Sequence, residues 1–229
     1  MNTDMSTNKT GGDQLILDLP VRAAQGRADF LVTGSNGDAV AWLDRWPDWP
    51  GPALCLFGPE GCGKSHLLRV WCARSEAVAV APEQLTAASI TNLAAQGAVA
   101  LDRADGLEDP EPLLHLYNLL AERGGFLLLA GRKPPRQWRL PLADLRSRLL
   151  AAPAAGIQPP DDRLLMAVMA KLFADRQVRV APDVLSFLVA RIERSFAAAE
   201  RAVRHLDYNS LAGQRPITVH SARAILAAV

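Results

Sequence analysis

The stretch of sequence that decides the fold runs from Ala53 to Arg74 and reads ALCLFGPEGCGKSHLLRVWCAR. It opens with an apolar run to Phe57, which is typical of a strand buried in a parallel sheet. It closes with the apolar spacing of an amphipathic helix. Between the two, Gly58 to Ser65 fits GxxxxGK[ST], the pattern of a phosphate-binding loop set between a strand and a helix. The sequence therefore predicts that this loop binds the phosphates of a nucleotide.

The chemistry of such a loop depends on its backbone. Glycines let the chain wrap closely, so that successive N–H groups point at phosphate oxygens, and the following helix adds its positive dipole end. We expect Lys64 to reach the β- and γ-phosphates and the Ser65 hydroxyl to ligate Mg²⁺. A purely structural glycine loop is the alternative. The residues predicted to bind nucleotide here are Pro59, Glu60, Gly61, Cys62, Gly63, Lys64, Ser65 and His66.

A metal ion at the loop needs a second carboxylate, and the sequence offers Asp102. This residue ends the apolar run that begins at Ala98, where a second buried strand would place it beside the loop. The alternative is an aspartate that only caps or turns the strand end. Many ATPases have an acid at the next position to activate water, but here it is Arg103. Asp105 is two residues further on, so we do not expect efficient ATP hydrolysis by this chain alone.

The chain divides into three regions by pattern. Residues 1–20 form a polar leader. Across residues 21–158, short apolar runs alternate with helical stretches, which predicts an α/β domain with a parallel sheet flanked by helices. Residues 159–229 carry helical patterns only, which predicts a small all-helical lid domain. Besides the strand and helix already quoted, we predict strands at 77–80, 98–101 and 126–130, and helices at 112–122, 142–150, 162–173, 182–192, 195–211 and 218–229.

Bulk composition sets limits on the function. The chain has 229 residues, of which 49% are hydrophobic and 21% charged, as in ordinary globular proteins. A formal net charge of +1 gives no overall field that would favour nucleic acid or a membrane. The polar first residues are unlike a signal peptide, so we expect a cytoplasmic protein. Cys55, Cys62 and Cys72 lack CxxC or metal-site spacing, and whether Cys62 in the loop is redox-active is left open.

A succession of short segments in the second half is similar to a known family. The segments are Leu116-Tyr-Asn-Leu-Leu120, Phe126-Leu-Leu-Leu-Ala-Gly131, Pro134-Pro-Arg-Gln137 and Leu145-Arg-Ser-Arg-Leu149. Together with the loop they resemble the AAA+ module of the bacterial replication initiator DnaA. They resemble more closely the Hda family, short DnaA paralogues that inactivate the initiator. The resemblance runs from Gln14 to the last helix. It implies ADP or ATP with Mg²⁺ as ligands, and DnaA and the DNA polymerase sliding clamp as partners.

Two further sites rest on this resemblance. Arg148 stands where the family carries an arginine finger, which reaches a neighbouring subunit's ATP and stabilises charge developing on the γ-phosphate. A solvated helix arginine is the alternative. In the leader, Gln14, Leu15, Leu17 and Leu19 look like the family's clamp-binding peptide. An extended peptide puts the three leucines on one face, although a short edge strand on the same domain would do so too.

The resemblance also covers the adenine site and the lid. Val32 and Asn36 match the segment that cradles the adenine base, whereas Asn36 taken alone fits a plain turn. The family's lid helix usually carries an arginine that senses the γ-phosphate, but the aligned residue here is Ala197. Arg194 and Arg201 lie a turn away on either side, and whether one of them substitutes is left open.

These observations predict a nucleotide-binding regulator of DNA replication initiation. It would dock on the sliding clamp and stimulate ATP hydrolysis by DnaA through Arg148. The alternative is an autonomous AAA+ ATPase or loader that remodels a replication partner, against which Arg103 argues. We expect no direct sequence-specific DNA binding and no membrane partner. The sequence leaves open self-association and the choice between ADP and ATP.

Overall fold

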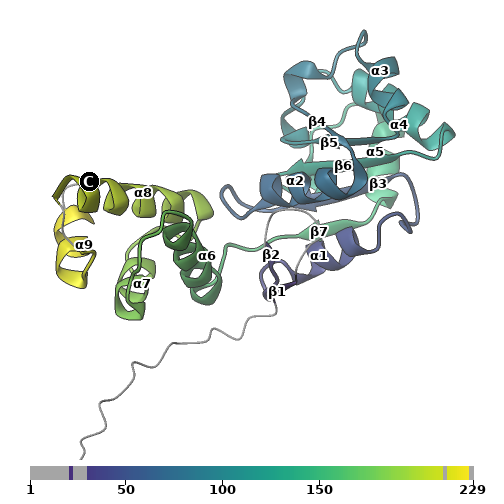
Figure 1. The fold of residues 1–229 in the computed structure, drawn as a ribbon. Helices are drawn as coiled ribbons and strands as arrows, with labels where there is room; N and C mark the ends of the chain where they lie inside the picture. Colours follow the sequence, from purple (N-terminus) through teal and green to yellow (C-terminus); the bar gives the residue numbers. More distant parts are fainter. Residues whose placement is uncertain (1–20, 23–29, 214–215, 227–229) are drawn as a thin grey trace, which may run out of the picture.

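The structure is a computed structural model that describes residues 21–22, 30–213 and 216–226 (Figure 1). The leader, with its predicted clamp-binding residues, lies outside these ranges. An α/β domain comes first and a helical region follows it, which confirms the predicted fold class. In chain order the elements are β1 Val21–Arg22, β2 Phe30–Leu31, α1 Gly37–Asp44, β3 Ala53–Phe57, α2 Lys64–Ser75, β4 Val78–Val80, η1 Pro82–Gln84, α3 Ile90–Ala95, β5 Ala98–Leu101, η2 Ala104–Gly106, α4 Glu111–Glu122, β6 Phe126–Gly131, η3 Pro135–Gln137, α5 Ala143–Ala151, β7 Ala154–Gly156, α6 Asp162–Asp175, α7 Pro182–Val189, α8 Phe196–Gly213 and α9 Val219–Leu226.

The main sheet of the described chain has five strands in the order β4-β5-β6-β3-β7. Every neighbouring pair in it is parallel. β6 lies between β3 and β5, with Phe57 opposite Gly131 and Leu101 opposite Leu129. Because the strands are parallel, their carboxyl ends meet at one edge of the sheet. The segments that follow β3, β5 and β6 are therefore brought together there.

Both faces of the sheet are covered, and alternate residues serve opposite faces. Cys55 and Leu129 belong to a buried cluster with residues of α3, α4 and α5. Leu54 and Leu128 belong to a second cluster with residues of α1 and α2. Burial on both faces explains why these strands read as continuous apolar runs rather than as alternating patterns.

The helical region, α6 to α9, has a core of its own, and we call it the lid (Figure 1). Its buried cluster draws Met169 and Phe173 from α6, Leu188 from α7 and Val203 from α8. The side chain of Asp161 accepts a hydrogen bond from the N–H of Leu164 at 2.8 Å and caps the start of α6. No helix in the described part of the chain is both long and apolar enough to cross a membrane.

Among the α-helices and the strands of the main sheet, α1, α3 and β7 were not predicted from the sequence, and neither were the short strands β1 and β2. β7, Ala154–Gly156, consists of alanine and glycine, which have little strand preference of their own. Its position comes from pairing with β3, where Cys55 N donates to Pro153 O at 2.9 Å and Ile157 N donates to Phe57 O at 2.7 Å. β7 therefore forms because it pairs with β3, and no local sequence pattern predicts it.

Candidate nucleotide-binding site

The loop between β3 and α2 has a backbone shape that requires its glycines. Gly61 has φ 73° and Gly63 has φ 104°, in the left-handed region that side chains with a Cβ rarely adopt. Gly58 is needed for space, because a Cβ there would lie 2.2 Å from the carbonyl oxygen of Ile157. α2 begins directly at Lys64, so its N-terminal dipole faces the loop.

Lys64 is held at the start of the loop. Its Nζ donates to Gly58 O at 2.8 Å and to Pro59 O at 2.7 Å, and the residue is only 9% exposed. A weak third contact, 3.7 Å long, goes to Cys62 Sγ. An ammonium group has three donors, so an incoming phosphate oxygen could take the third one from the thiol.

Ser65 and Asp102 meet at the carboxyl edge of the sheet. The Ser65 hydroxyl donates to Asp102 Oδ2 at 2.5 Å, although the residues belong to α2 and to the segment after β5. A hydroxyl and a carboxylate are oxygen ligands, which Mg²⁺ prefers. The two predicted metal ligands therefore lie close enough to serve one ion, and this donor set fits magnesium.

The residues after Asp102 are arranged differently from a hydrolytic site. Arg103 has φ 54°, and its N–H donates to Asp102 Oδ1 at 2.9 Å. Its guanidinium pairs with Glu83 at 3.1 Å. Asp105 Oδ2 accepts the backbone N–H of Arg132 at 2.7 Å. A cation thus stands where many ATPases have the water-activating acid, and the next carboxylate is engaged by the backbone.

An ion pair at the rim of the loop was not predicted from the sequence. Arg132 Nη2 lies 2.7 Å from Glu60 Oε2. Arg132 follows β6 directly, and β6 registers with β3 up to the start of the loop. Glu60 and Arg132 are far apart in sequence and become neighbours through this register of β3 and β6. A correct prediction of the strand order would have identified the pair.

The lid touches the loop at the start of α8. Phe196 N donates to Gly61 O at 3.1 Å. A Cβ built on Gly63 would lie 2.9 Å from the Phe196 ring, and one built on Gly61 would lie 2.6 Å from Ser195 Cβ. The two left-handed glycines therefore also provide the room for the lid. Sequence reasoning did not single out Ser195 or Phe196.

The lid arginines considered from the sequence pair with acids of the lid itself. Arg194 Nη2 lies 2.9 Å from Asp162, in the first turn of α6. Arg201 Nη2 lies 3.9 Å from Glu193. Ala197 follows Phe196 and is exposed. The lid groups found in contact with the loop are thus Ser195 and Phe196 rather than these arginines.

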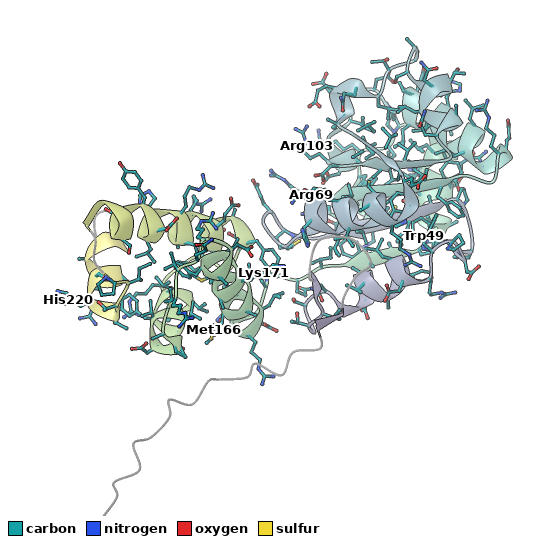
Figure 2. The ribbon with its side chains drawn as sticks, viewed as in Figure 1. Trp49, Arg69, Arg103, Met166, Lys171 and His220 are labelled. Carbon is teal, nitrogen blue, oxygen red and sulfur yellow. The ribbon has the colours of Figure 1, made fainter. Side chains whose placement is uncertain are left out.

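Basic side chains gather beside the start of α2. Burial lowers the pKa of His66, and the nearby charges of Arg69 and Lys171 lower it further. Figure 2 shows Arg69 on α2 and Lys171 on α6, on the facing sides of the α/β domain and the lid. With its pKa lowered, His66 is neutral at pH 7, while the two flanking cations favour a polyphosphate ligand.

The predicted adenine residues lie in the segment before α1. Asn36 is 5% exposed, and its Oδ1 accepts the N–H of Thr33 at 2.9 Å. Gln158 N donates to Ser35 O at 2.8 Å, which ties the segment to the chain after β7. Val32 packs against the cluster shared by α1 and α2. Asn36 thus closes a turn, and contact of either residue with adenine stays a prediction.

Arg148 lies on α5, apart from the loop. α5 packs in the cluster on one face of the sheet, and α2 packs in the cluster on the other. Arg148 Nε donates to Asp144 Oδ1 at 2.8 Å, and its Cζ lies 5.4 Å from the centroid of the Tyr117 ring. The side chain is 38% exposed. Arg148 thus lies on the helix layer opposite α2, and its role as an arginine finger stays a prediction.

Together, the parallel sheet, the loop after β3 and the lid define the fold as that of an AAA+ P-loop module. Domain III of the Thermotoga maritima replication initiation protein DnaA matches with a TM-score of 0.73 at 17% identity, over 86% of this chain and 93% of that one. AMPPCP-bound DnaA from Aquifex aeolicus matches with a TM-score of 0.67 at 15% identity, over 81% of this chain and 65% of that one. The Thermotoga maritima RuvB Holliday junction branch migration motor matches at 0.64 and 14% identity, over 77% and 61%. No family model matches the sequence. Identities this low establish a shared fold.

Proposed function

We propose that this chain is a nucleotide-binding regulator of DNA replication initiation, of the Hda kind. It holds ADP or ATP with Mg²⁺, docks on the sliding clamp through its leader, and stimulates ATP hydrolysis by DnaA through Arg148. One observation carries the proposal. Ser65 and Asp102 meet at 2.5 Å beside a complete phosphate loop, whereas the next residue is Arg103, paired with Glu83. The site is thus equipped to bind nucleotide and poorly equipped to hydrolyse it.

Nucleotide binding would use the residues of the loop and its two neighbours. The N–H groups from Gly61 to Ser65 would face the phosphates, and Lys64 would add its charge. Ser65 and Asp102 would hold the metal ion, which neutralises phosphate charge when bound. Two proteins of similar fold support this ligand class. DnaA was solved with AMPPCP, and the FIGL-1 AAA domain, at a TM-score of 0.56 and 14% identity, was solved with ADP.

The arginine finger would act on a partner. A hydrogen bond to Asp144 is the main reason why the pKa of Arg148 is raised. A guanidinium is charged at every physiological pH in any case. The Tyr117 ring below it adds a cation–π contact. Both contacts orient the guanidinium before any partner arrives, which reduces the entropy lost when it meets a γ-phosphate. The DnaA-like fold supports DnaA as that partner.

Location and assembly follow from the same proposal. The protein would be cytoplasmic and would reach DNA through the clamp and DnaA rather than by reading sequence itself. Gln14, Leu15, Leu17 and Leu19 would provide the contact with the clamp.

The decisive experiment measures ATP hydrolysis in a mixture of DnaA, clamp loaded on DNA, and this protein, beside each component alone. We expect hydrolysis only in the full mixture. Arg148→Ala should lower its rate by on the order of a thousandfold, as arginine fingers do. Arg146→Ala, an exposed arginine on the same helix, should leave the rate unchanged. Leu15→Ala/Leu17→Ala should abolish stimulation by removing the docking peptide.

The opposite outcome favours the alternative function. If this chain alone hydrolyses ATP at the rate of the full mixture, and Arg148→Ala has no effect, the protein is an autonomous ATPase or loader. Hydrolysis that Arg146→Ala lowers as much as Arg148→Ala would contradict the finger assignment, because both changes remove the same charge from α5.

A further inference from the structure

Arg132 occupies a defined place at the edge of the sheet. It follows β6, and β6 lies between β3, which leads into the loop, and β5, which leads to Asp102. The backbone is fixed on both sides, because Gly58 N donates to Gly131 O at 3.2 Å and Arg132 N donates to Asp105 Oδ2 at 2.7 Å. The base of the Arg132 side chain is therefore held between the phosphate loop and the predicted metal ligand.

A third phosphate would arrive at the same place. In phosphate loops the metal bridges the β- and γ-phosphates, and here its predicted ligands, Ser65 and Asp102, meet at 2.5 Å. The β-phosphate would lie in the loop itself, so the γ-phosphate would lie between the ends of β3 and β5. β6 lies between β3 and β5, and Arg132 is the first residue after β6.

The guanidinium of Arg132 already binds one carboxylate. Its Nη2 lies 2.7 Å from Glu60 Oε2, with the two side chains 67% and 80% exposed. An ion pair so exposed adds little to folding stability, so it can be exchanged at small cost. A guanidinium also presents five N–H donors in a fork that suits phosphate. The same side chain can therefore turn from Glu60 to a phosphate.

We propose that Glu60 and Arg132 set the nucleotide preference of the loop, a proposal that rests on the proposed nucleotide binding. Arg132 binds the third phosphate of a nucleoside triphosphate, and Glu60 competes with that phosphate for the guanidinium. A diphosphate leaves the ion pair intact. A triphosphate separates it and brings the γ-phosphate close to an unpaired Glu60. Glu60 thus limits the gain in triphosphate binding that Arg132 provides, whereas a diphosphate is bound without disturbing the pair.

A second ion pair provides the matched control. Arg103 and Glu83 lie 3.1 Å apart, with side chains 63% and 67% exposed. This pair joins the segments after β5 and β4, one strand further from the loop than Arg132. Glu83→Gln therefore removes a comparable carboxylate from a comparable pair without freeing Arg132.

The test measures dissociation constants of the full chain for ADP and for AMPPCP, both with Mg²⁺. Arg132→Ala should weaken AMPPCP binding about tenfold, as expected for one charge-assisted hydrogen bond, and should change ADP binding less than about twofold. Glu60→Gln should tighten AMPPCP binding about threefold, because screening in water limits the gain. Glu83→Gln should change neither constant. Added salt should reduce the differences between variants and wild type.

Each contrary result has a distinct meaning. If Arg132→Ala and Glu60→Gln change ADP and AMPPCP binding equally, or not at all, the pair does not set the preference. Lys64→Ala separates this failure from failure of the proposed function, because it should remove binding of both nucleotides. A wild-type chain that binds neither nucleotide would overturn the proposed function and this inference together.

Discussion

Replacing Gly61 by alanine tests the contact between the lid and the phosphate loop. Gly61 has φ 73°, and a Cβ added there would lie 2.6 Å from Ser195 Cβ. The change therefore has two costs: the left-handed backbone and the contact with the lid. Gly97→Ala isolates the first cost, because Gly97 has φ 76° and a Cβ there would meet nothing within 4 Å.

The two costs can be estimated separately. A residue with a Cβ in the left-handed conformation costs about 1–2 kcal/mol. Carbon atoms prefer separations of about 3.5–4.0 Å, so the lid must move by about 1 Å to accept the new methyl group. Overpacking of this kind costs about 1–3 kcal/mol. We therefore expect Gly61→Ala to lower the free energy of unfolding by about 2–5 kcal/mol, and Gly97→Ala by about 1–2 kcal/mol.

Chemical denaturation of the purified variants provides the assay. Ser195→Gly removes the obstructing Cβ, so Gly61→Ala/Ser195→Gly should recover most of the excess over Gly97→Ala. Ser195→Gly has a small cost of its own, a few tenths of a kcal/mol, because Ser195 Oγ accepts the N–H of Ala198 at 3.1 Å near the start of α8. Equal effects of Gly61→Ala and Gly97→Ala would refute the reasoning, since the lid would then not rest on the loop.

Two further predictions concern the metal and the thiols. Asp102→Asn should weaken Mg²⁺-dependent ADP binding about 10- to 100-fold and leave ADP binding in EDTA unchanged. Titrations of ADP with and without Mg²⁺ would check this. An equal loss of ADP affinity under both conditions would contradict the assignment of Asp102 as a metal ligand. Burial raises the pKa of Cys55 from 9.0 to about 12, and burial also raises that of Cys62. These thiols should therefore resist alkylation at pH 8 until the chain is unfolded. Because the pKa of Cys55 is higher in the folded chain, its contribution to the free energy of unfolding is fully present below pH 9.0 and should decline as the pH rises towards about 12. Stoichiometric labelling of folded Cys62 at pH 7 would contradict the prediction that this thiol is protected.

The central strands and the loop could be predicted from the sequence because local and tertiary signals agree there. β3 and β5 have the bounds expected from their apolar runs, and α2 begins at Lys64 as the motif requires. Strands covered on both faces must be apolar throughout, which makes them easy to recognise. The motif also demands a strand before the loop and a helix after it, so one match determines three elements.

The rest of the site depends on distances that sequence alone does not give. Glu60 and Arg132 become neighbours only through the order β5-β6-β3, which a list of strands leaves undetermined. The contacts of Ser195 and Phe196 with the loop depend on how the lid packs against the α/β domain. Arg194 and Arg201 were considered because they lie a turn away from the position of the family's sensor arginine, whereas packing brings Ser195 and Phe196 to the glycines.

In this site, metal binding would use the carboxylate of Asp102, whereas activation of water would use the side chain at position 103. The two functions can therefore change independently of each other. Asp102 uses one carboxylate oxygen for the Ser65 hydroxyl and the other for the backbone N–H of Arg103. Any residue at position 103 except proline offers that N–H, so the hydrogen bond that orients Asp102, the predicted metal ligand, does not require an acidic side chain there. An arginine there can therefore remove the water-activating acid while Asp102 keeps its orientation. A chain with such a site would gain nothing from an arginine finger acting on its own nucleotide, which is consistent with the proposal that Arg148 acts on a partner.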